Sequence, residues 1–451
     1  MSDAGHGGGD GKLPFLHSIE HFVEQTNEGA GVYIPGWGLM WAFLILIFGF
    51  FALAPVQTML NFEFLFFLAP VWLTFLIVRW AIFSFVKWRR TDWSAEHKWV
   101  LLEIRIPHDN IRTPAAMEAF FHSLHIPAGQ GTWYKRHVFG RTRDWWSFEI
   151  CSAEGKIRFY VWTRERIRRA TESFLYAQYP NIEIIEAEDY SRLINPSHGN
   201  WSMFACEYTF TKPSPYPIKT YVQYGLDRND LKEGHFVDPF ANVLELFGAL
   251  GKDEHYWFQI VCRATRHDTQ QGKPDIKTQA KQLIDKLRAQ SIEYGHGGHA
   301  QFPIASPGML MQMEAIERNV GKLTYDVGIR SIYFARPDKY MGMMAGMAVQ
   351  LMKVYNSEMF NGLVPAPLWS EKFNDYPWED IGGKRQAREM HEVVEFYRRR
   401  AYFHPPYKGP WLVMSTEELA TIYHIPTTHI QTPGLERIQS TSAKPPTNLP
   451  V

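Results

Sequence analysis

Residues 37–55 read WGLMWAFLILIFGFFALAP and carry no charge, and residues 64–86 read FLFFLAPVWLTFLIVRWAIFSFV with Arg79 as their one charged side chain. Each run has about 20 residues, which at a rise of about 1.5 Å per residue crosses a hydrocarbon core about 30 Å thick. A helix satisfies its own backbone polar groups and can therefore cross lipid. Because the connection between the runs is short, the sequence predicts a transmembrane helical hairpin over residues 36–90.

Basic side chains predict the orientation of this hairpin. Lys87, Arg89 and Arg90 follow the second run, and such clusters stay on the cytoplasmic side of a membrane. Both ends of the chain are therefore expected in the cytoplasm, with the connection at 57–61 outside. Arg79 lies one to two turns from the end of the run and is expected to snorkel to the headgroups. The alternative is a hairpin buried in a soluble core, which is disfavoured because these runs are longer and more uniformly apolar than core helices.

The rest of the composition is typical of globular domains in a reducing compartment. The chain has 47 basic and 47 acidic residues, so its charge does not indicate a nucleic-acid or acidic-substrate binder. Cys151, Cys206 and Cys262 lack CxxC spacing, which indicates packed thiols and neither a disulfide framework nor a zinc site. Residues 1–35 lack the basic segment of a signal peptide and are expected to form a cytoplasmic tail with one short amphipathic helix.

Alternating apolar residues and helix signals over residues 95–195 predict a ferredoxin-like unit with the order β-α-β-β-α-β. The start of the first helix is indicated by Thr113-Pro114, and the strands are indicated by period-2 alternation. The expected elements are a strand at 100–106, a helix from Thr113-Pro114, strands at 146–150 and 157–161, a helix at 165–179 and a strand at 182–184.

The same order recurs over residues 200–365, where an insertion at about 265–320 with an amphipathic helix replaces the central hairpin turn. The sixth element of this order, a strand, is not identified, because the stretch after Asn361 is rich in proline. The expected elements are a strand at 204–210, a helix from Asp238-Pro239 to Leu250, strands at 256–262 and 323–329, and a helix from Asp338 to about Tyr355.

The fold class predicted is therefore α+β: a transmembrane hairpin, two ferredoxin-like units and a C-terminal helical and extended region over 366–451. Each unit is expected to have the strand order 4-1-3-2, with its helices on one face of its own sheet. A capping box at 415–418 predicts a short helix in the C-terminal region. Residues 427–451 are expected to be extended and to pair with a neighbouring protein.

No known catalytic or cofactor motif is present in the sequence. Gly382-Gly383-Lys384-Arg385 lacks the glycine spacing and the hydroxyl residue of a phosphate-binding loop. His296 and His299 lie three residues apart, with His267 in the same insertion, but a metal site needs further ligands and a solvated loop is the favoured interpretation. We therefore expect no catalytic residue, no metal and no cofactor.

A methionine-rich helix and two arginine clusters are the remaining candidates for binding. The methionines at 341, 343, 344, 347 and 352 are interpreted as core, with an adaptable binding surface as the alternative. Basic clusters can contact nucleic acid or anionic lipid, and without an RNP-type motif a solvated face or the anionic leaflet is favoured. The clustered residues are Arg164, Arg166, Arg168, Arg169, Arg398, Arg399 and Arg400.

Several long segments resemble an uncharacterised family of bacterial membrane proteins. They are LLEIRIPHDNIRTPAAMEAFFHSLH (101–125), EGKIRFYVWTRERIRRATESFLYAQYPNIEIIEAEDY (154–190), YPIKTY (216–221), YRRRAYFHPPYKGP (397–410) and LVMSTEELATIYHIPTTHIQTPGLERIQSTSAKPPTNLPV (412–451). In that family a membrane hairpin precedes this region, and in some members an ATPase resembling type IV secretion and conjugation motors follows it. The resemblance implies a bacterial inner-membrane location and a motor as neighbour, and it carries no catalytic residues.

These observations lead us to expect a membrane-anchored, non-enzymatic cytoplasmic adaptor for a secretion-type or DNA-translocating ATPase. Homo-oligomerisation is expected if that partner is a ring. The alternative is a membrane-tethered nucleic-acid-binding protein that uses the arginines at 164–169 and 398–400.

Overall fold

The structure is a computed structural model. It describes residues 69–127, 131–195, 200–227, 238–266, 275–293, 305–366, 384–404 and 407–438, with single helical positions at 45, 48, 49, 52, 63 and 67. The chain divides into two compact units, one over residues 5–89 and one that begins at Arg90.

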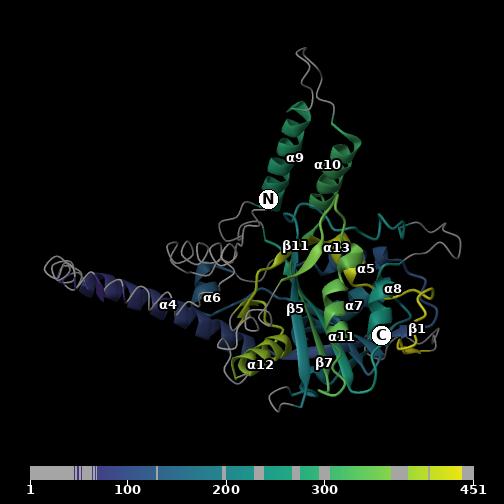
Figure 1. Cartoon of the computed structure of the whole chain (residues 1–451), viewed down its shortest axis with the longest axis horizontal. Coiled ribbons are helices and arrows are strands. Elements are labelled where there is room, and N and C mark those ends of the chain that lie inside the picture. Colours follow the sequence, from purple (N-terminus) through teal and green to yellow (C-terminus); the bar gives the residue numbers. More distant parts are fainter. Residues whose placement is uncertain are drawn as a thin grey trace. The chain divides into compact units, whose positions relative to one another are not determined.

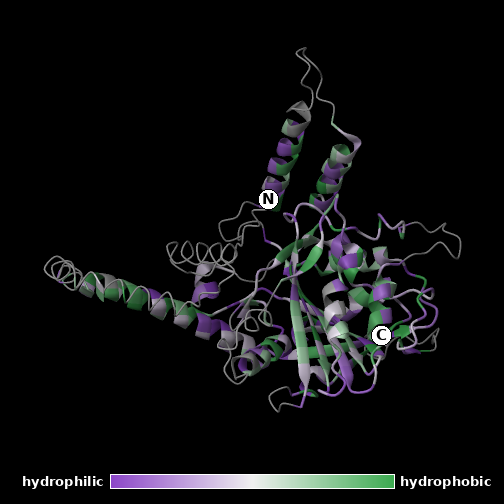
Figure 2. Ribbon diagram, in the orientation of Figure 1, coloured by the Kyte–Doolittle hydropathy of each residue, from purple (hydrophilic) through white to green (hydrophobic). Residues whose placement is uncertain are grey.

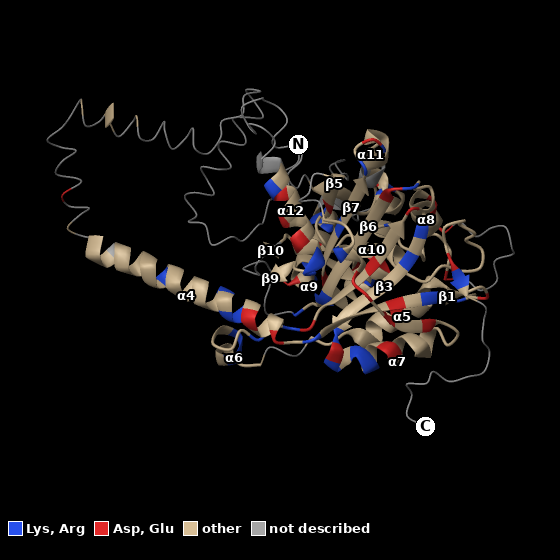
Figure 3. Ribbon diagram, turned by 90° about the horizontal axis from the view of Figure 1, so that it is seen from below, with Lys and Arg blue, Asp and Glu red and all other residues tan. Residues whose placement is uncertain are grey.

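The helix α4 (Ala69–Ala95) is the one described helix that is long and apolar enough to cross a membrane. Its most apolar stretch has a mean hydropathy of 1.8, and none of that stretch is buried. Figure 2 shows apolar residues along α4, and Figure 3 shows charged residues toward its C-terminal end. The helix continues nine residues past Val86, where the sequence analysis ended the second apolar run.

The predicted hairpin is not supported by the described residues. Its first run, 37–55, lies outside the described part of the chain except for Ile45, Phe48, Gly49 and Ala52, which are helical. The described part therefore contains one candidate span and not two.

The second unit is built on a ten-stranded, largely antiparallel sheet (Figure 1). In the first half of the unit the strand order is β4-β1-β3-β2, and in the second half it is β6-β7-β5-β8. Each half therefore has the order 4-1-3-2 that the sequence predicts. The strands are β1 (Trp99–Pro107), β2 (Trp146–Ala153), β3 (Lys156–Arg164), β4 (Glu183–Ala187), β5 (Ser202–Phe210), β6 (Glu254–Ala264), β7 (Thr324–Ala335), β8 (Leu363–Ala366), β11 (Leu412–Ser415) and β12 (Arg437–Ile438).

The two halves join edge to edge, which the sequence did not predict. Strands β2 and β6 pair antiparallel from Trp146 opposite Cys262 to Ala153 opposite His255. The duplication therefore produces one continuous sheet and not two separate platforms. Each strand in the middle of this sheet is buried on both faces, so nearly all of β2, β6 and β7 is inaccessible to solvent.

Five helices cover one face of the sheet. Their apolar side chains share a single core with the strands, as Phe121 shows by its contact with Phe148 at a ring-centroid distance of 5.0 Å. Leu175 and Leu351 belong to this core and Phe174 packs against it, whereas the side chain of Met347 lies outside the described residues. The helices are α5 (Pro114–Leu124), α7 (Arg168–Gln178), α8 (Phe240–Gly248), α11 (Gly342–Gln350) and α13 (Thr416–Ile422).

The opposite face is covered by α12 (Lys384–Arg398) and by a small ribbon of β9 (Phe403–His404) and β10 (Tyr407–Lys408). Tyr397 of α12 packs on Trp257 of β6 at a ring-centroid distance of 5.3 Å. Residues that the sequence analysis placed in a separate C-terminal region therefore complete the core of the same unit.

The final described segment also joins this unit. Strand β11 pairs with β7, and the capping box predicted at 415–418 is present, with Ser415 and Glu418 bonded reciprocally to the backbone at the start of α13. Strand β12 pairs in parallel with Ile106 and Pro107 of β1. Residues 427–438, expected to pair with a neighbour, are thus packed on their own sheet, and residues beyond 438 lie outside the described part.

Two element boundaries differ from the sequence prediction. The helix expected from Asp338 begins at Gly342, because residues 336–340 form a hydrogen-bonded turn in which Lys339 and Tyr340 donate to the Arg336 carbonyl. The last strand of the second half, which is the sixth element of the βαββαβ order, is β8. It pairs with β5 although Pro365 lies within it. Proline is tolerated there because β8 is an edge strand.

The insertion between β6 and β7 forms a helical arm of α9 (Ile276–Glu293) and α10 (Pro307–Val320), and Figure 1 shows it projecting away from the sheet. The sequence analysis predicted only the first of these helices. The base of the arm is fixed by Arg318, which pairs with Glu417 at 3.1 Å, and by Asn319, which donates to the Pro215 carbonyl at 3.3 Å.

Candidate functional site: buried charges beneath α12

A buried ion-pair network lies between the sheet and the end of α12. Arg400 is 1% exposed and donates through Nε and Nη2 to the two oxygens of Glu149 at 2.9 and 3.0 Å. Its Nη1 and Nη2 also donate to Asp189 at 2.5 and 3.0 Å. The guanidinium therefore joins β2, the segment after β4 and the segment after α12.

The other oxygen sites of Glu149 are also occupied. Ser147 donates to it at 2.6 Å, Tyr190 at 2.8 Å and Gln259 at 2.9 Å. Tyr190 and Tyr397 hydroxyls lie 2.7 Å apart. A buried carboxylate with this many donors is held in one position, so it anchors the surrounding strands and α12.

The protonation of this network follows from its geometry. Burial alone would lower the pKa of Arg400, but the charge of Glu149 and the hydrogen bonds to both carboxylates raise it well above its ordinary value. Burial would raise the pKa of Asp189, but Arg400 lowers it. Arg400 and Asp189 are therefore both charged over the physiological range.

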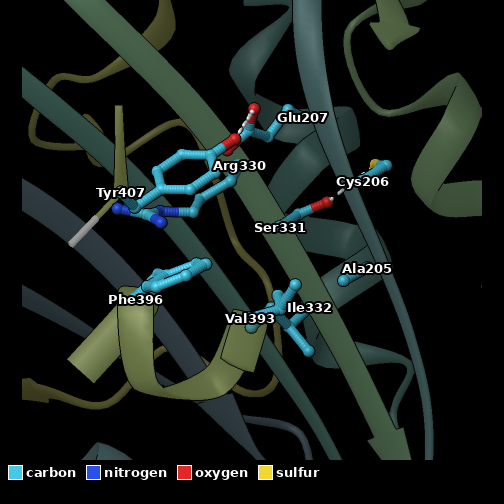
Figure 4. A pocket seen from close by; sticks show the side chains of 9 residues that line it. All are labelled: Ala205, Cys206, Glu207, Arg330, Ser331, Ile332, Val393, Phe396 and Tyr407. Carbon is cyan, nitrogen blue, oxygen red and sulfur yellow. Dashed lines mark hydrogen bonds between the residues drawn. The ribbon is translucent and has the colours of Figure 1, made fainter. Parts of the chain in front are cut away.

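A small pocket adjoins the network, with an empty volume of about 250 Å³ including the solvent at its mouth. Figure 4 shows Tyr407 and Arg330 at one side, with the Tyr407 hydroxyl donating to Glu207 at 2.7 Å. Arg330 itself donates to Gln259 at 2.7 Å and to the Ala401 carbonyl at 2.8 Å. The lining residues are Ala205, Cys206, Glu207, Arg330, Ser331, Ile332, Val393, Phe396 and Tyr407.

Burial favours the neutral forms of Cys206 and Glu207 in this pocket. Burial raises the pKa of Cys206, although bonds from Ser331 and Tyr208 oppose the effect, so its thiol stays protonated. Burial also raises the pKa of Glu207, against the influence of Arg330 and Tyr407. A nucleophile needs an adjacent base, and the partners that these hydrogen bonds give to Cys206 and Glu207 are the hydroxyl groups of Ser331 and Tyr407.

The first predicted arginine cluster is divided between the interior and the surface. Arg164 is 1% exposed, bonds to Asp144 at 2.7 Å, and lies over the rings of Trp93, Trp99 and Trp145. Arg166 pairs with the same carboxylate and is half-exposed. Arg168 bridges Glu172 and Glu186, and Arg169 is exposed at the start of α7.

The second predicted cluster is divided in the same way. Arg398 donates to the Ser191 and Ile194 carbonyls and to Glu395, whereas Arg399 is half-exposed and lies 3.5 Å from Glu395. Arg400 is the buried centre of the network. The structure therefore leaves Arg166, Arg169 and Arg399 as the members of the two clusters with exposed side chains.

The other predicted features are distributed as follows. His267, His296 and His299 lie outside the described residues, and among the described ones no group of three His, Cys, Asp or Glu side chains is placed to hold a metal. Met352 is buried, Met344 packs against the core, and Met341 and Met343 are exposed. The membrane-flank residues Lys87, Arg89 and Arg90 lie in the last three turns of α4.

Three buried ionisable residues were not identified from the sequence. Glu149, Asp326 and Arg263 occupy strand positions within apolar runs, and all three are buried. An ionisable side chain inside an otherwise apolar strand indicates a buried partner, so these positions carried a usable signal. The identity of each partner was not readable, since Glu149 and Arg400 are 251 positions apart.

The described part of the chain thus defines an α+β protein with one large antiparallel sheet, a dense set of buried ion pairs and one candidate membrane helix. By its sequence the chain belongs to the family described as Domain of unknown function (DUF8128), whose model matches residues 90–437. This match begins at the same residue as the second compact unit. None of the curated proteins compared with the chain matches it.

Proposed function

We propose that this chain is a membrane-anchored, non-enzymatic adaptor whose unit from Arg90 onward lies on the cytoplasmic side of a bacterial inner membrane. The observation that carries the proposal is α4, a 27-residue helix whose most apolar stretch has no buried residue. Such a surface is stable in lipid and costly in water. Lys87, Arg89 and Arg90 at its end supply the positive charge expected on the cytoplasmic side.

The arrangement of buried charges supports a binding role over a catalytic one. Glu149, Asp189 and Arg400 neutralise one another, and Asp144 and Arg164 do the same beneath the tryptophans. These groups hold elements together that are far apart in the sequence. We interpret each half as a ferredoxin-like unit, and their fusion produces a rigid sheet suited to presenting surfaces to another protein.

The helical arm is the surface that we assign to the protein partner. Its base is bonded to the sheet unit, while Leu310 and Met311 on α10 are 55% and 52% exposed. Exposed methionine and leucine on a projecting helix form an adaptable apolar contact. The resemblance identified from the sequence suggests an ATPase of the secretion or conjugation type as this partner, with oligomerisation if the ATPase forms a ring.

The test is purification of the full chain from detergent-solubilised membranes, followed by identification of proteins recovered in near-stoichiometric amount. We expect an ATPase with the wild-type chain and its loss with Leu310→Gln/Met311→Gln. The matched control is Met343→Gln, because Met343 is an exposed methionine outside the arm. Recovery of a clean monomer without a partner would contradict the proposal. Equal recovery of the ATPase with the arm variant and with the control variant would contradict its assignment to the arm.

A further inference from the structure

We propose that Arg90, Arg136, Arg143 and Arg263 form a binding site for the phosphate of an anionic phospholipid headgroup. The site lies at the C-terminal end of α4, where four elements contribute one arginine each: α4, α6 (Trp133–His137), the loop before β2, and β6. The inference rests on the proposed function, because it requires α4 to lie in a membrane.

Two of these guanidinium groups share a single carboxylate. Arg143 Nη2 and Arg263 Nε lie 3.3 and 2.9 Å from the same oxygen of Asp326, and Thr265 donates to the other oxygen at 2.9 Å. Arg143 also donates to the Ala264 carbonyl at 2.7 Å. One negative charge therefore faces two positive charges, both of which are almost completely buried.

Arg90 and Arg136 add further positive charge without adding a counterion. The charges of Arg263 and Arg136 both act on Arg90, so each of these two arginines lies within electrostatic range of Arg90. Figures 1 and 3 both place α6 beside the end of α4. Among the described residues, neither Arg90 nor Arg136 makes an ion pair within 4.0 Å.

The nearby groups Asp144 and His404 do not neutralise the excess positive charge of these arginines. Asp144, which follows Arg143 in the chain, is occupied by Arg164 at 2.7 Å and by Arg166 at 2.5 Å. The ring of His404 lies 3.4 Å from Arg263 and carries no negative charge. Among the described residues, Asp326 is the one carboxylate that forms an ion pair with any of these four arginines.

The unmet hydrogen-bonding capacity points to an oxyanion. The Nε atoms of Arg136 and Arg143 are buried and have no partner among the described residues. Burial and the charge of Arg263 lower the pKa of Arg143 to about 10, against the influence of Asp326, so it remains charged near neutrality. Buried like charges are costly unless an anion offsets them, and phosphate oxygens match the planar donors of arginine.

The position along α4 selects a lipid as the source of that phosphate. Arg90 is four residues beyond Val86, the last residue of the apolar run, which is about 6 Å along a helix. This distance matches the depth of the headgroup layer. Basic pockets at the cytoplasmic end of a membrane helix suit anionic headgroups. The side chains of Arg143 and Arg263 are only 3% and 6% exposed, so the site is recessed and unlike the open track that a nucleic-acid strand requires.

The experiment uses the full-length chain in detergent micelles, supplied with equal amounts of phosphatidylglycerol and phosphatidylcholine, and counts retained lipids by native mass spectrometry. The wild-type chain should retain phosphatidylglycerol preferentially. Arg136→Gln and Arg90→Gln should each reduce that retained fraction by at least about fivefold, the effect expected for one basic residue at a membrane surface. The control Arg288→Gln removes an exposed arginine on α9 and should change nothing.

Equal retention of the two lipids by the wild-type chain would overturn the inference, as would a loss in Arg288→Gln as large as in Arg136→Gln. Displacement of the lipid by soluble glycerol phosphate at equal concentration would assign the site to a soluble phosphate and also overturn it. Unchanged thermal midpoints of the variants without lipid would show that they fold. Release of the wild-type chain from membranes by alkaline carbonate would contradict the proposed function itself, a result separate from any lipid preference.

Discussion

Removal of the buried Arg400 guanidinium should be among the most destabilising single changes in this chain. The substitution Arg400→Met keeps the apolar stem and removes the donors to Glu149, Asp189 and the Arg398 carbonyl. Glu149 is 0% exposed and would retain Ser147, Tyr190 and Gln259 but no positive partner. Breaking a buried pair in this way costs about 3–5 kcal/mol, because an uncompensated charge stays buried.

The assay is urea unfolding of the full chain in detergent, followed by tryptophan fluorescence, since Trp257 and Trp162 lie close to the network. Arg399→Met is the matched control: that side chain is 57% exposed, lies 3.5 Å from Glu395, and should cost no more than about 1 kcal/mol. The double variant Glu149→Met/Arg400→Met should be less destabilised than Arg400→Met alone, because the fully buried charge of Glu149 is gone and only the partly exposed Asp189 is left without its partner. A cost for Arg400→Met equal to that of Arg399→Met would refute the reasoning.

Three further predictions concern packing, pH and orientation. A Cβ on Gly434 would overlap the carbonyl oxygen of Gly155, so Gly434→Ala should lower the urea midpoint of unfolding. A Cβ on Gly346 would have no atom within 4 Å, so Gly346→Ala should leave the midpoint equal or higher. Equal midpoints for the two variants would contradict the described packing. Burial raises the pKa of Glu418 from 4.5 to about 7, so between these pH values the native state holds a proton that the unfolded state lacks. The free energy of unfolding should therefore fall by about 1.4 kcal/mol per pH unit as pH rises through this range. Glu418→Gln should remove this component, and an unchanged pH slope in that variant would argue against it. The three native cysteines are buried, so an impermeant thiol reagent should report on introduced cysteines. Arg169→Cys should react only after cells are opened, and Thr58→Cys should react in intact cells if the chain has the predicted hairpin. The reverse pattern would invert the topology.

Local signals predicted the parts of the fold that depend on neighbouring residues. The starts of α5 and α13 were readable because Thr113-Pro114 and the Ser415–Glu418 capping box act within one helical turn. The strand alternation gave the order within each half, since a βαββαβ pattern allows few topologies.

The long-range parts were not readable, for physical reasons. Pairing of β2 with β6 uses backbone hydrogen bonds that any two edge strands can make, so no residue type indicates this pairing. The arginine clusters appeared to be solvated faces because their carboxylate partners are remote in sequence: Asp144 is 20 positions from Arg164, and Glu149 is 251 positions from Arg400. The site at the end of α4 likewise depends on Arg136, Arg143 and Arg263 converging from separate elements.

Membrane anchoring by α4 is the claim on which the account depends, and alkaline carbonate extraction of isolated membranes tests it most directly. The full chain should remain in the membrane pellet. Leu76→Arg/Phe83→Arg should shift it to the supernatant, because each charge within the span costs about 2.5–3.5 kcal/mol, whereas Thr74→Ser should not. Recovery of the wild-type chain in the carbonate supernatant would contradict the account.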